Sequence, residues 1–266
     1  MKENNVFKGS RLSKFLKPFG LAHGQLEENV RFWFRYFTEK DEIHLLIREF
    51  GYFFPEAVFI QIGANDGMAL DPLRAQILFK KWRGYMMEPV PYLFKRLKKL
   101  YEKNPRIVTI NAAIADVDGQ LPFYSIAESD SDDVWSWYHA LGSFRREIIL
   151  KHKNLIPDIE GRIQEIVVDC MRFETLCSKN SIDRIDLLQM DTEGYDFEII
   201  KRIPFDRYRP TMIVYEHLHL GENDRGACIN YLESFGYSIL VSKFDVAALQ
   251  LDKLEGKQKK LARFFE

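Results

Sequence analysis

The stretch FIQIGANDGMA, residues 59–69, is an apolar run that stops at a glycine and then turns polar. It predicts a buried strand followed by a tight turn, and a helix over about 71–82 follows with Pro72 tolerated in its first turn. In open α/β sheets, ligands bind where such strands end. This strand–loop–helix unit therefore starts an α/β fold and marks a candidate binding loop.

The same alternation continues along the chain. Further runs rich in β-branched and aromatic residues predict strands, with helical patterns between most of them: GYMMEPV (84–90), RIVTINAAIA (106–115), LPFYSI (121–126), RIQEIVVDC (162–170), IDLLQMD (185–191), TMIVYEH (211–217) and YSILVSKFD (237–245). Strands separated by helices predict a mostly parallel sheet with helices on both faces. We therefore expect a Rossmann-like α/β domain over residues 55–266.

Two parts of the chain depart from this alternation. Residues 1–54 predict an N-terminal helical extension, in which Ile43, Leu46, Ile47 and Phe50 share one helix face. Residues 127–160 have no clean period, and we expect them to be an inserted segment that forms a lid over a substrate.

Composition narrows the classes of partner. The 266 residues are 46% hydrophobic and 29% charged, and the net charge of -1 gives no reason to expect nucleic acid. Three cysteines are too few for a disulfide framework, which favours a cytoplasmic setting. No apolar run has the length of a transmembrane segment, and no signal peptide is evident. The basic first twenty residues leave peripheral membrane contact a weak alternative, and aromatic residues near Trp33 make a homo-oligomer possible.

The loop after residue 62 does not match the common phosphate-binding motifs. A dinucleotide fingerprint needs glycines at its first, third and sixth positions, but Asn65 and Met68 occupy the last two. No Lys-Ser or Lys-Thr pair follows, so a P-loop is excluded. The remaining pattern, Gly63-x-Asn65-x-Gly67, suits the amino-acid end of S-adenosylmethionine (SAM). Glu88, at the end of the next strand, could then accept the two ribose hydroxyls.

Several segments together resemble the FkbM family of SAM-dependent methyltransferases: IQIGANDG (60–67), MMEPVPYLFKRLKK (86–99), INAAIADVDGQLPFY (110–124) and IDLLQMDTEGYDFEIIKRI (185–203), followed by IVYEH (213–217). The resemblance covers roughly residues 59–245. It implies a Rossmann-like methyltransferase fold, SAM as methyl donor and, usually, O-methylation of hydroxyls on sugars or other natural products. It also implies a set of cofactor-binding residues: Gly63, Ala64, Asn65, Asp66, Gly67, Glu88 and Pro89, with Ala112 and Ala113 near the adenine.

Asp191, Glu193 and Asp196 follow the strand 185–191. One interpretation is structural, with Asp191 or Thr192 capping the next helix and acids complementing its dipole. The other places Asp191 against the SAM amino group or the acceptor hydroxyl. A base that takes the acceptor's proton contributes about 10²–10⁴-fold to the rate. The candidates are Asp191, His217 and His139, and histidine is the better generic base near neutral pH.

The acid and histidine residues also raise the question of a metal. Asp191, Glu216 and His217 end adjacent predicted strands, and His219 follows, but no spacing demands a metal site. We therefore predict no metal, with a divalent cation at Asp191, Glu216 and His217 as the weak alternative.

The segment DVWSWYHALGSF (133–144) carries the candidate acceptor contacts. Trp135, Trp137 and Tyr138 would exclude water and stack on a sugar ring, or would simply pack on the sheet. Polar contacts to the acceptor are assigned to three residues: Ser143, Arg145 and Glu193.

The sequence therefore predicts a SAM-dependent methyltransferase that acts on a hydroxyl of a carbohydrate or related small molecule. Two alternatives remain open at this point: a non-catalytic SAM- or carbohydrate-binding module, and a nicotinamide-dependent oxidoreductase with a degenerate Rossmann loop.

Overall fold

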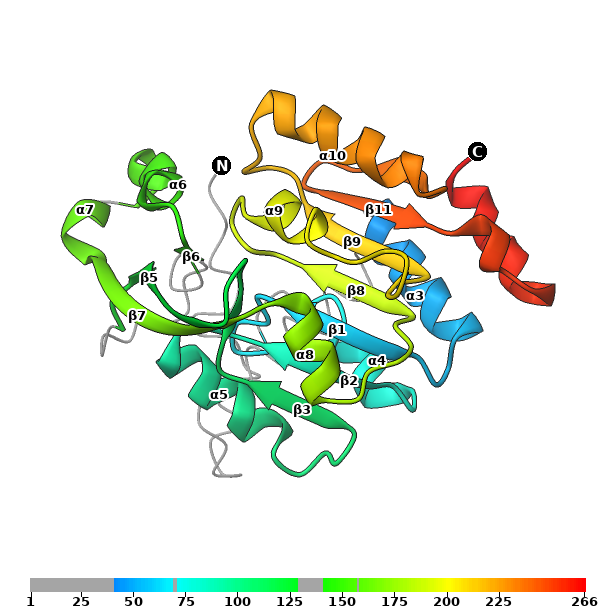
Figure 1. Ribbon diagram of the computed structural model, residues 1–266, viewed down its shortest axis with the longest axis horizontal. Coiled ribbons are helices and arrows are strands. Elements are labelled where there is room, and N and C mark those ends of the chain that lie inside the picture. Colours follow the sequence, from blue (N-terminus) through cyan, green and yellow to red (C-terminus); the bar gives the residue numbers. More distant parts are fainter. Residues whose placement is uncertain (1–40, 69–70, 129–140, 157) are drawn as a thin grey trace, which may run out of the picture.

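The computed structural model describes residues 41–68, 71–128, 141–156 and 158–266 (Figure 1). Its main element is a seven-stranded sheet with the order β10-β11-β9-β8-β1-β2-β3. The strands, in that order, are β10 (Ser238–Val241), β11 (Asp245–Leu249), β9 (Met212–Glu216), β8 (Leu187–Met190), β1 (Val58–Ile62), β2 (Arg83–Met87) and β3 (Ile107–Ile110). The five strands from β9 to β3 are parallel, and β11 is antiparallel to both of its neighbours. The mostly parallel sheet predicted from the alternation of strands and helices is confirmed.

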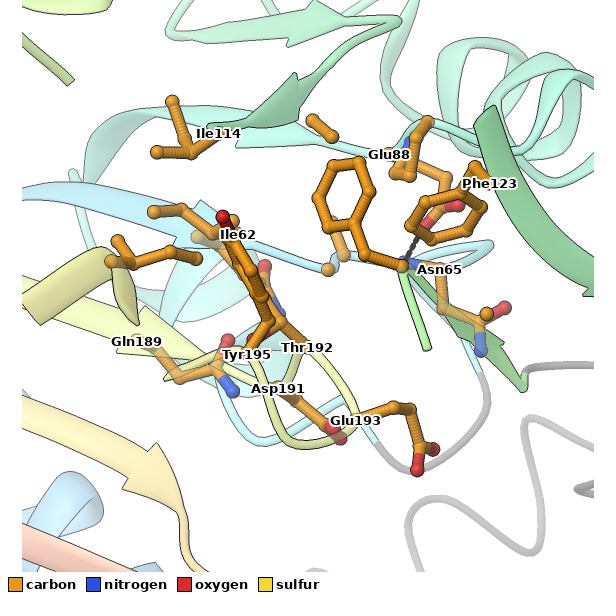
Figure 2. Close-up of a pocket in the computed structure, with 18 of the residues that line it drawn as sticks. Ile62, Asn65, Glu88, Ile114, Phe123, Gln189, Asp191, Thr192, Glu193 and Tyr195 are labelled. Carbon is orange, nitrogen blue, oxygen red and sulfur yellow. Dashed lines mark hydrogen bonds between the residues drawn. The ribbon is translucent and has the colours of Figure 1, made fainter. Parts of the chain in front are cut away.

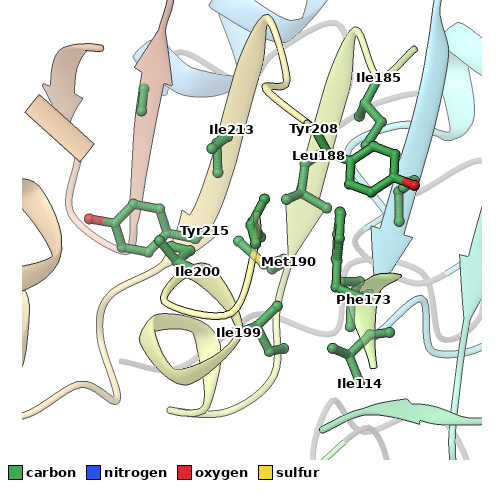
Figure 3. Close-up of a cluster of buried hydrophobic side chains, with 14 of the residues drawn as sticks. Ile114, Phe173, Ile185, Leu188, Met190, Ile199, Ile200, Tyr208, Ile213 and Tyr215 are labelled. Atoms are coloured by element: carbon green, nitrogen blue, oxygen red, sulfur yellow. The ribbon is translucent and has the colours of Figure 1, made fainter. Parts of the chain in front are cut away.

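Helices cover both faces of this sheet, which is why β1 and β8 are buried along their whole length. One core contains side chains of α8 (Phe173–Lys179), α9 (Asp196–Ile200) and α10 (Glu222–Ser234). Figure 3 shows Phe173 and Ile199 packed beside Leu188 and Met190 of β8. The core on the other face contains side chains of α4 (Arg74–Phe79) and α5 (Pro91–Tyr101).

Helix α3 (Glu42–Phe53) belongs to that second core. Its N-cap Asp41 accepts hydrogen bonds from the backbone N–H groups of Ile43 and His44. The face predicted from the sequence is the buried one, and Leu46 and Phe50 pack in the same cluster as β1. Its neighbour is η5 (Gly256–Phe264), which follows η4 (Leu251–Lys253) at the C-terminal end. The earlier part of the predicted extension lies outside the described residues.

A second sheet has the order β4-β7-β5-β6, with β4 (Ala113–Ile114), β7 (Ile163–Met171), β5 (Gly119–Ile126) and β6 (Gly142–Ser143). Residues 162–170, predicted as a strand of the main sheet, instead pair antiparallel with β5 along its whole length. The physical reason is exposure: β7 has alternating exposed positions, whereas the central strands are buried on both faces.

The described part of the predicted lid connects β5 to β7. It comprises β6, α6 (Arg146–Leu150), η3 (Lys151–Asn154) and α7 (Ile159–Arg162), and it has a small core that includes Leu141, Ile149 and Ile156. Within the part of the chain that the structure describes, no helix has the length and apolar character needed to cross a membrane.

Candidate cofactor and acceptor site

A pocket opens at the carboxyl ends of β1, β2 and β8 (Figure 2). It encloses about 1110 Å³, its open mouth included. Seven of the residues that the sequence assigns to the cofactor line this pocket: Gly63, Ala64, Asn65, Glu88, Pro89, Ala113 and Asp191. The other three lie beside it: Ala112 is in the hydrophobic core, and Asp66 and Gly67 are in the turn behind Asn65.

The glycine-bounded turn is shaped by close backbone approach. Gly63 has φ +79, and a Cβ at this position would lie 1.9 Å from the carbonyl oxygen of Asp191. Its N–H and that of Ala64 both donate to the carbonyl oxygen of Met87, at 3.0 and 2.9 Å. Gly67, with φ +71, faces the side chain of Leu97 with no room for a Cβ. Only glycine fits either position.

Glu88 joins the turn to the end of β2. Its Oε2 accepts the N–H of Asn65 and its Oε1 accepts that of Val90, both at 2.8 Å. The side chain is 5% exposed, and this burial raises the pKa of its carboxyl from 4.5 to about 7. Each carboxylate oxygen keeps a second lone pair. Glu88 can therefore still accept hydroxyl donors from a ligand in the pocket.

Three buried acceptor oxygens at the pocket have no hydrogen-bond partner among the described residues: Gln61 Oε1, Asp71 Oδ2 and Gln189 Oε1. Gln61 and Gln189 occupy the same register on the adjacent strands β1 and β8. The Gln61 amide donates its Nε2 to Asp71 Oδ1 at 3.1 Å, which fixes its oxygen as the free acceptor. Unpaired buried acceptors are costly, so this group fits a cationic donor such as an ammonium.

The sequence analysis assigned no role to these three residues, although the two glutamines stand out in the sequence. A glutamine interrupts each of two fully apolar strands one residue before the strand's last residue. A polar side chain that is central in a buried strand needs a partner, and here the partner is not supplied by the neighbouring strands.

The wall of the pocket nearest the second sheet is aromatic. Phe144 lies 5.0 Å from Phe123 and 4.8 Å from Tyr195 between ring centroids, and all three line the pocket. Together with Ala113 and Ile114, they offer flat apolar surface to a planar ligand group.

The turn after β8 carries the predicted acid cluster. Asp191 faces the pocket and is the most exposed of these acids, whereas Asp196 is fully buried. Asp191 is open to the pocket, but the protein atoms around it desolvate its carboxyl and raise its pKa to about 6, and burial raises the pKa of Asp196 to about 7. Burial, with the charges of Asp191 and Asp196, holds the pKa of Glu193 well above its ordinary value.

Asp196 lies in the first turn of α9, where an acid complements the helix dipole as predicted, but neither Asp191 nor Thr192 caps the helix. Helix α9 begins at Asp196, its N-cap is Tyr195, and no side chain makes a cap hydrogen bond. Instead, Asp196 Oδ2 accepts the Thr192 hydroxyl at 2.8 Å. Asp191 is therefore left facing the pocket.

Among the histidines, His219 rather than His217 lies at the acid cluster. His217 Nε2 is 3.0 Å from the carbonyl oxygen of Ser242, and His217 does not line the pocket. His219 Nδ1 lies 2.8 Å from Glu216 Oε2 and 3.0 Å from Glu193 Oε2. Burial lowers the pKa of His219 to about 4, which keeps its ring neutral. Four predicted residues, Trp135, Trp137, Tyr138 and His139, lie outside the described residues.

Ser143 and Arg145, predicted as acceptor contacts, do not line the pocket, and Ser143 instead anchors the turn that carries Glu193. The Ser143 hydroxyl donates to the carbonyl oxygen of Glu193 at 3.0 Å and accepts the N–H of Arg145 at 3.2 Å. Ser143 is 1% exposed. This bond ties β6 of the second sheet to the loop that follows β8 of the main sheet.

Comparison with known proteins shows which family this chain matches. Residues 61–239 match the family model described as the methyltransferase FkbM domain. The 2-O-methyltransferase NoeI of Sinorhizobium fredii (strain NBRC 101917 / NGR234) is 26% identical over 187 residues, covering 68% of this chain and 73% of that protein.

Two solved structures are also similar to this chain. Methyltransferase FkbM from Methylobacillus flagellatus KT has a TM-score of 0.47 at 14% identity, over 73% of this chain and 44% of that one. Aeropyrum pernix fibrillarin with natively bound S-adenosyl-L-methionine has a TM-score of 0.37 at 11% identity, over 73% of this chain and 66% of that one. The family match covers most of this chain, and the chain therefore belongs to the FkbM family of methyltransferases.

Proposed function

We propose that this protein transfers a methyl group from SAM to a hydroxyl of a carbohydrate or related small metabolite. The observation that carries the proposal is the Glu88 carboxylate, held against the Gly63–Gly67 turn by its bond from the Asn65 N–H at the head of the pocket. The similarity to a protein named as a 2-O-methyltransferase favours oxygen as the acceptor atom.

The pocket fits SAM group by group. Glu88 would accept the ribose hydroxyls, the aromatic and aliphatic wall would hold the adenine, and the acceptors on Gln61, Asp71 and Gln189 would meet the ammonium group. When bound, SAM supplies a methyl group already activated by its sulfonium.

Asp191 is our candidate for the general base. It faces the open pocket, and its pKa of about 6 leaves it ionised at neutral pH and basic enough to accept a proton. In this role the carboxylate takes the proton that the acceptor hydroxyl loses as its oxygen is methylated. Alignment of the acceptor oxygen with the methyl group contributes the larger share of the reduction in the activation barrier, up to about 7–11 kcal/mol in well-oriented systems.

We further propose that α3 is part of the catalytic domain, and that the acceptor enters from the side of residues 141–156 of the predicted lid. Leu46 and Phe50 of α3 are buried with β1 in one core. Phe144 of the segment lines the pocket, and Ser143 holds the Glu193 turn.

The cofactor assignment is tested by thermal unfolding with S-adenosylhomocysteine, SAM or NAD. A ligand at about 100 times its dissociation constant adds roughly 2.7 kcal/mol to the free energy of unfolding, which raises the melting temperature of a chain of this size by about 5–11 °C. We expect the first two ligands to raise the melting temperature and NAD to leave it unchanged. Stabilisation by NAD alone would contradict the proposal.

Single substitutions test which residues bind the cofactor and which act on the acceptor. Glu88→Ala should abolish stabilisation by S-adenosylhomocysteine, whereas Glu174→Gln, an exposed acid on α8, should leave it intact. Asp191→Asn distinguishes a general base from a cofactor ligand. Because Asp191 is proposed as the base, the substitution should lower kcat and leave the dissociation constant of the cofactor unchanged. Incubation with SAM and a panel of saccharides, followed by mass spectrometry, should show a gain of one methyl group. A bound cofactor with no methylated product from any hydroxyl acceptor would favour the non-catalytic binding module.

A further inference from the structure

His152, Glu193 and His219 converge beside the cofactor pocket. Each offers one ligand atom, and these three atoms all lie within 4.8 Å of one another. His152 comes from η3 of the lid segment, Glu193 from the turn after β8, and His219 from the loop after β9. Glu193 also lines the pocket, so the cluster borders the space that an acceptor would occupy (Figure 2). This set shares no member with the Asp191, Glu216 and His217 set suggested by sequence.

Two carboxylates approach one ring nitrogen in this cluster. Glu216 Oε2 and Glu193 Oε2 lie 2.8 and 3.0 Å from His219 Nδ1, which carries at most one N–H. His219 Nδ1 lies within hydrogen-bond distance of Glu216 Oε2, and Glu193 Oε2 is a buried atom with no hydrogen-bond partner among the described residues. The protein therefore leaves a carboxylate oxygen unsatisfied beside two imidazole rings.

The cluster lies among acidic residues. The charged neighbours with the largest effect on Glu216 are Asp191, Glu193, Asp196 and Asp245, all of them acids. Arg225 lies close enough to affect His219, but its guanidinium donates to the carbonyl oxygens of Leu218 and Leu220.

The backbone holds Glu193 in place at a cost. Its φ of +50 lies in the left-handed region, which costs a non-glycine residue about 1–3 kcal/mol. Gly194 follows with φ +85, and the Ser143 hydroxyl fixes the Glu193 carbonyl. The turn thus presents a strained residue, and its carboxylate is the one that faces the two histidines.

We propose that His152, Glu193 and His219 bind one divalent first-row transition metal ion of the zinc type. Two imidazoles and a carboxylate are typical ligands of such ions and leave a fourth position open, whereas Mg²⁺ and Ca²⁺ prefer oxygen ligands. Tetrahedral ligation at about 2.0–2.1 Å puts ligand atoms roughly 3.4 Å apart, so small side-chain rotations close the site. When Glu216 accepts the Nδ1–H of His219, the other ring nitrogen keeps its lone pair for the metal.

The role of the metal rests on the proposed function, although the site itself does not. At the open position, the ion holds the acceptor's hydroxyl oxygen and lowers the pKa of its proton. That proton passes to the Asp191 carboxylate, and the oxygen's electron pair forms the bond to the methyl carbon as the carbon–sulfur bond breaks. The metal thus positions the acceptor without entering the cofactor site.

The test is metal binding by the full chain after chelator treatment and dialysis. We expect one equivalent of Zn²⁺ by elemental analysis, and one equivalent of Co²⁺ with the visible absorption of a four-coordinate site. His152→Ala and His219→Ala should abolish binding, and Glu216→Gln should weaken it about 10–100-fold, as loss of an outer partner does. His217→Asn is the matched control, because its ring contacts Ser242 and should leave the metal affinity unchanged.

Affinity for S-adenosylhomocysteine serves as the folding control and should be unchanged in all four variants. Stoichiometric metal in the unmodified protein that is equally retained by His152→Ala and His219→Ala would overturn the site, as would the absence of any bound metal. Metal bound at this cluster by a protein that methylates no hydroxyl would support the site and overturn the proposed function. A His219→Cys variant that recovers Zn²⁺ would support ligation over a hydrogen-bonding role.

Discussion

At the scale of single residues, the pocket depends on two positions that contact backbone atoms closely. Gly63 is the clearest, because its left-handed backbone and its contact with the Asp191 carbonyl exclude any Cβ. Glu88 is the second, because its carboxylate is bonded on both sides to backbone N–H groups. Both residues were predicted as cofactor residues from the sequence.

Gly63→Ala should destabilise the protein by about 3 kcal/mol or more, since overpacking and backbone strain each cost about 1–3 kcal/mol. The control is Gly226→Ala within α10, where an added Cβ meets nothing within 4 Å. That change should stabilise by about 0.5–1 kcal/mol through helix propensity. Urea unfolding of both variants measures the difference, and equal effects would contradict the packing of the turn.

Glu88 should make stability depend on pH. Its carboxyl keeps its proton up to pH about 7 in the folded state but only to about 4.5 when unfolded. The folded state therefore binds more protons between these values, and the free energy of unfolding falls as pH rises through this window. Glu88→Gln does not titrate, so the unmodified protein should lose about 2–3 kcal/mol relative to it between pH 5 and 8. A difference in the free energy of unfolding between the two proteins that stays constant from pH 5 to 8 would contradict the raised pKa.

At the scale of elements, the second sheet contributes to the site through one short strand. β6 has two residues, yet its Ser143 reaches across to the Glu193 carbonyl of the main sheet's loop. Because the hydroxyl lies in the interior, this bond is an attachment between elements rather than a surface contact.

Ser143→Ala should cost about 1–3 kcal/mol, since it leaves the Glu193 carbonyl and the Arg145 N–H without their partner. We expect kcat to fall while the affinity for S-adenosylhomocysteine holds, because the acid turn moves and the Gly63 turn does not. Ser178→Ala is the control, because this hydroxyl bonds within the exposed end of α8. A kcat equal to that of the control would argue against anchoring.

At the scale of the whole molecule, the fold has two cores, one on each face of the main sheet, and α3 completes the second. This packing supports our proposal that α3 belongs to the catalytic domain, although the sequence motifs begin at residue 59. Leu46 is fully buried in that core.

Leu46→Ala should reduce the free energy of unfolding by about 2–5 kcal/mol, through lost burial and the cavity left behind. Tyr52→Ala, on the same helix and 69% exposed, should change it far less. Chemical denaturation compares the two variants. A small effect at Leu46 would mean that α3 is a separate extension after all.

The sequence alone determined the buried strands of the central sheet and the glycine-bounded turn after β1. Both are local: apolar runs of strand length, helical periods between them, and Gly63, Asn65 and Gly67 within five consecutive residues. The Glu88 assignment followed because the carboxyl ends of parallel strands meet at one edge of a sheet. These features need no knowledge of distant contacts.

Only the tertiary structure decided which residues from separate segments meet. Residues 163–171 form a strand of the second sheet rather than of the main sheet, since strand pairing depends on which partner's edge is free. It brought Gln61 and Gln189 into register, and it placed His219, not His217, beside Glu193. Strand β9 ends at Glu216, and beyond a strand end the alternation of side chains no longer fixes the direction in which a residue points.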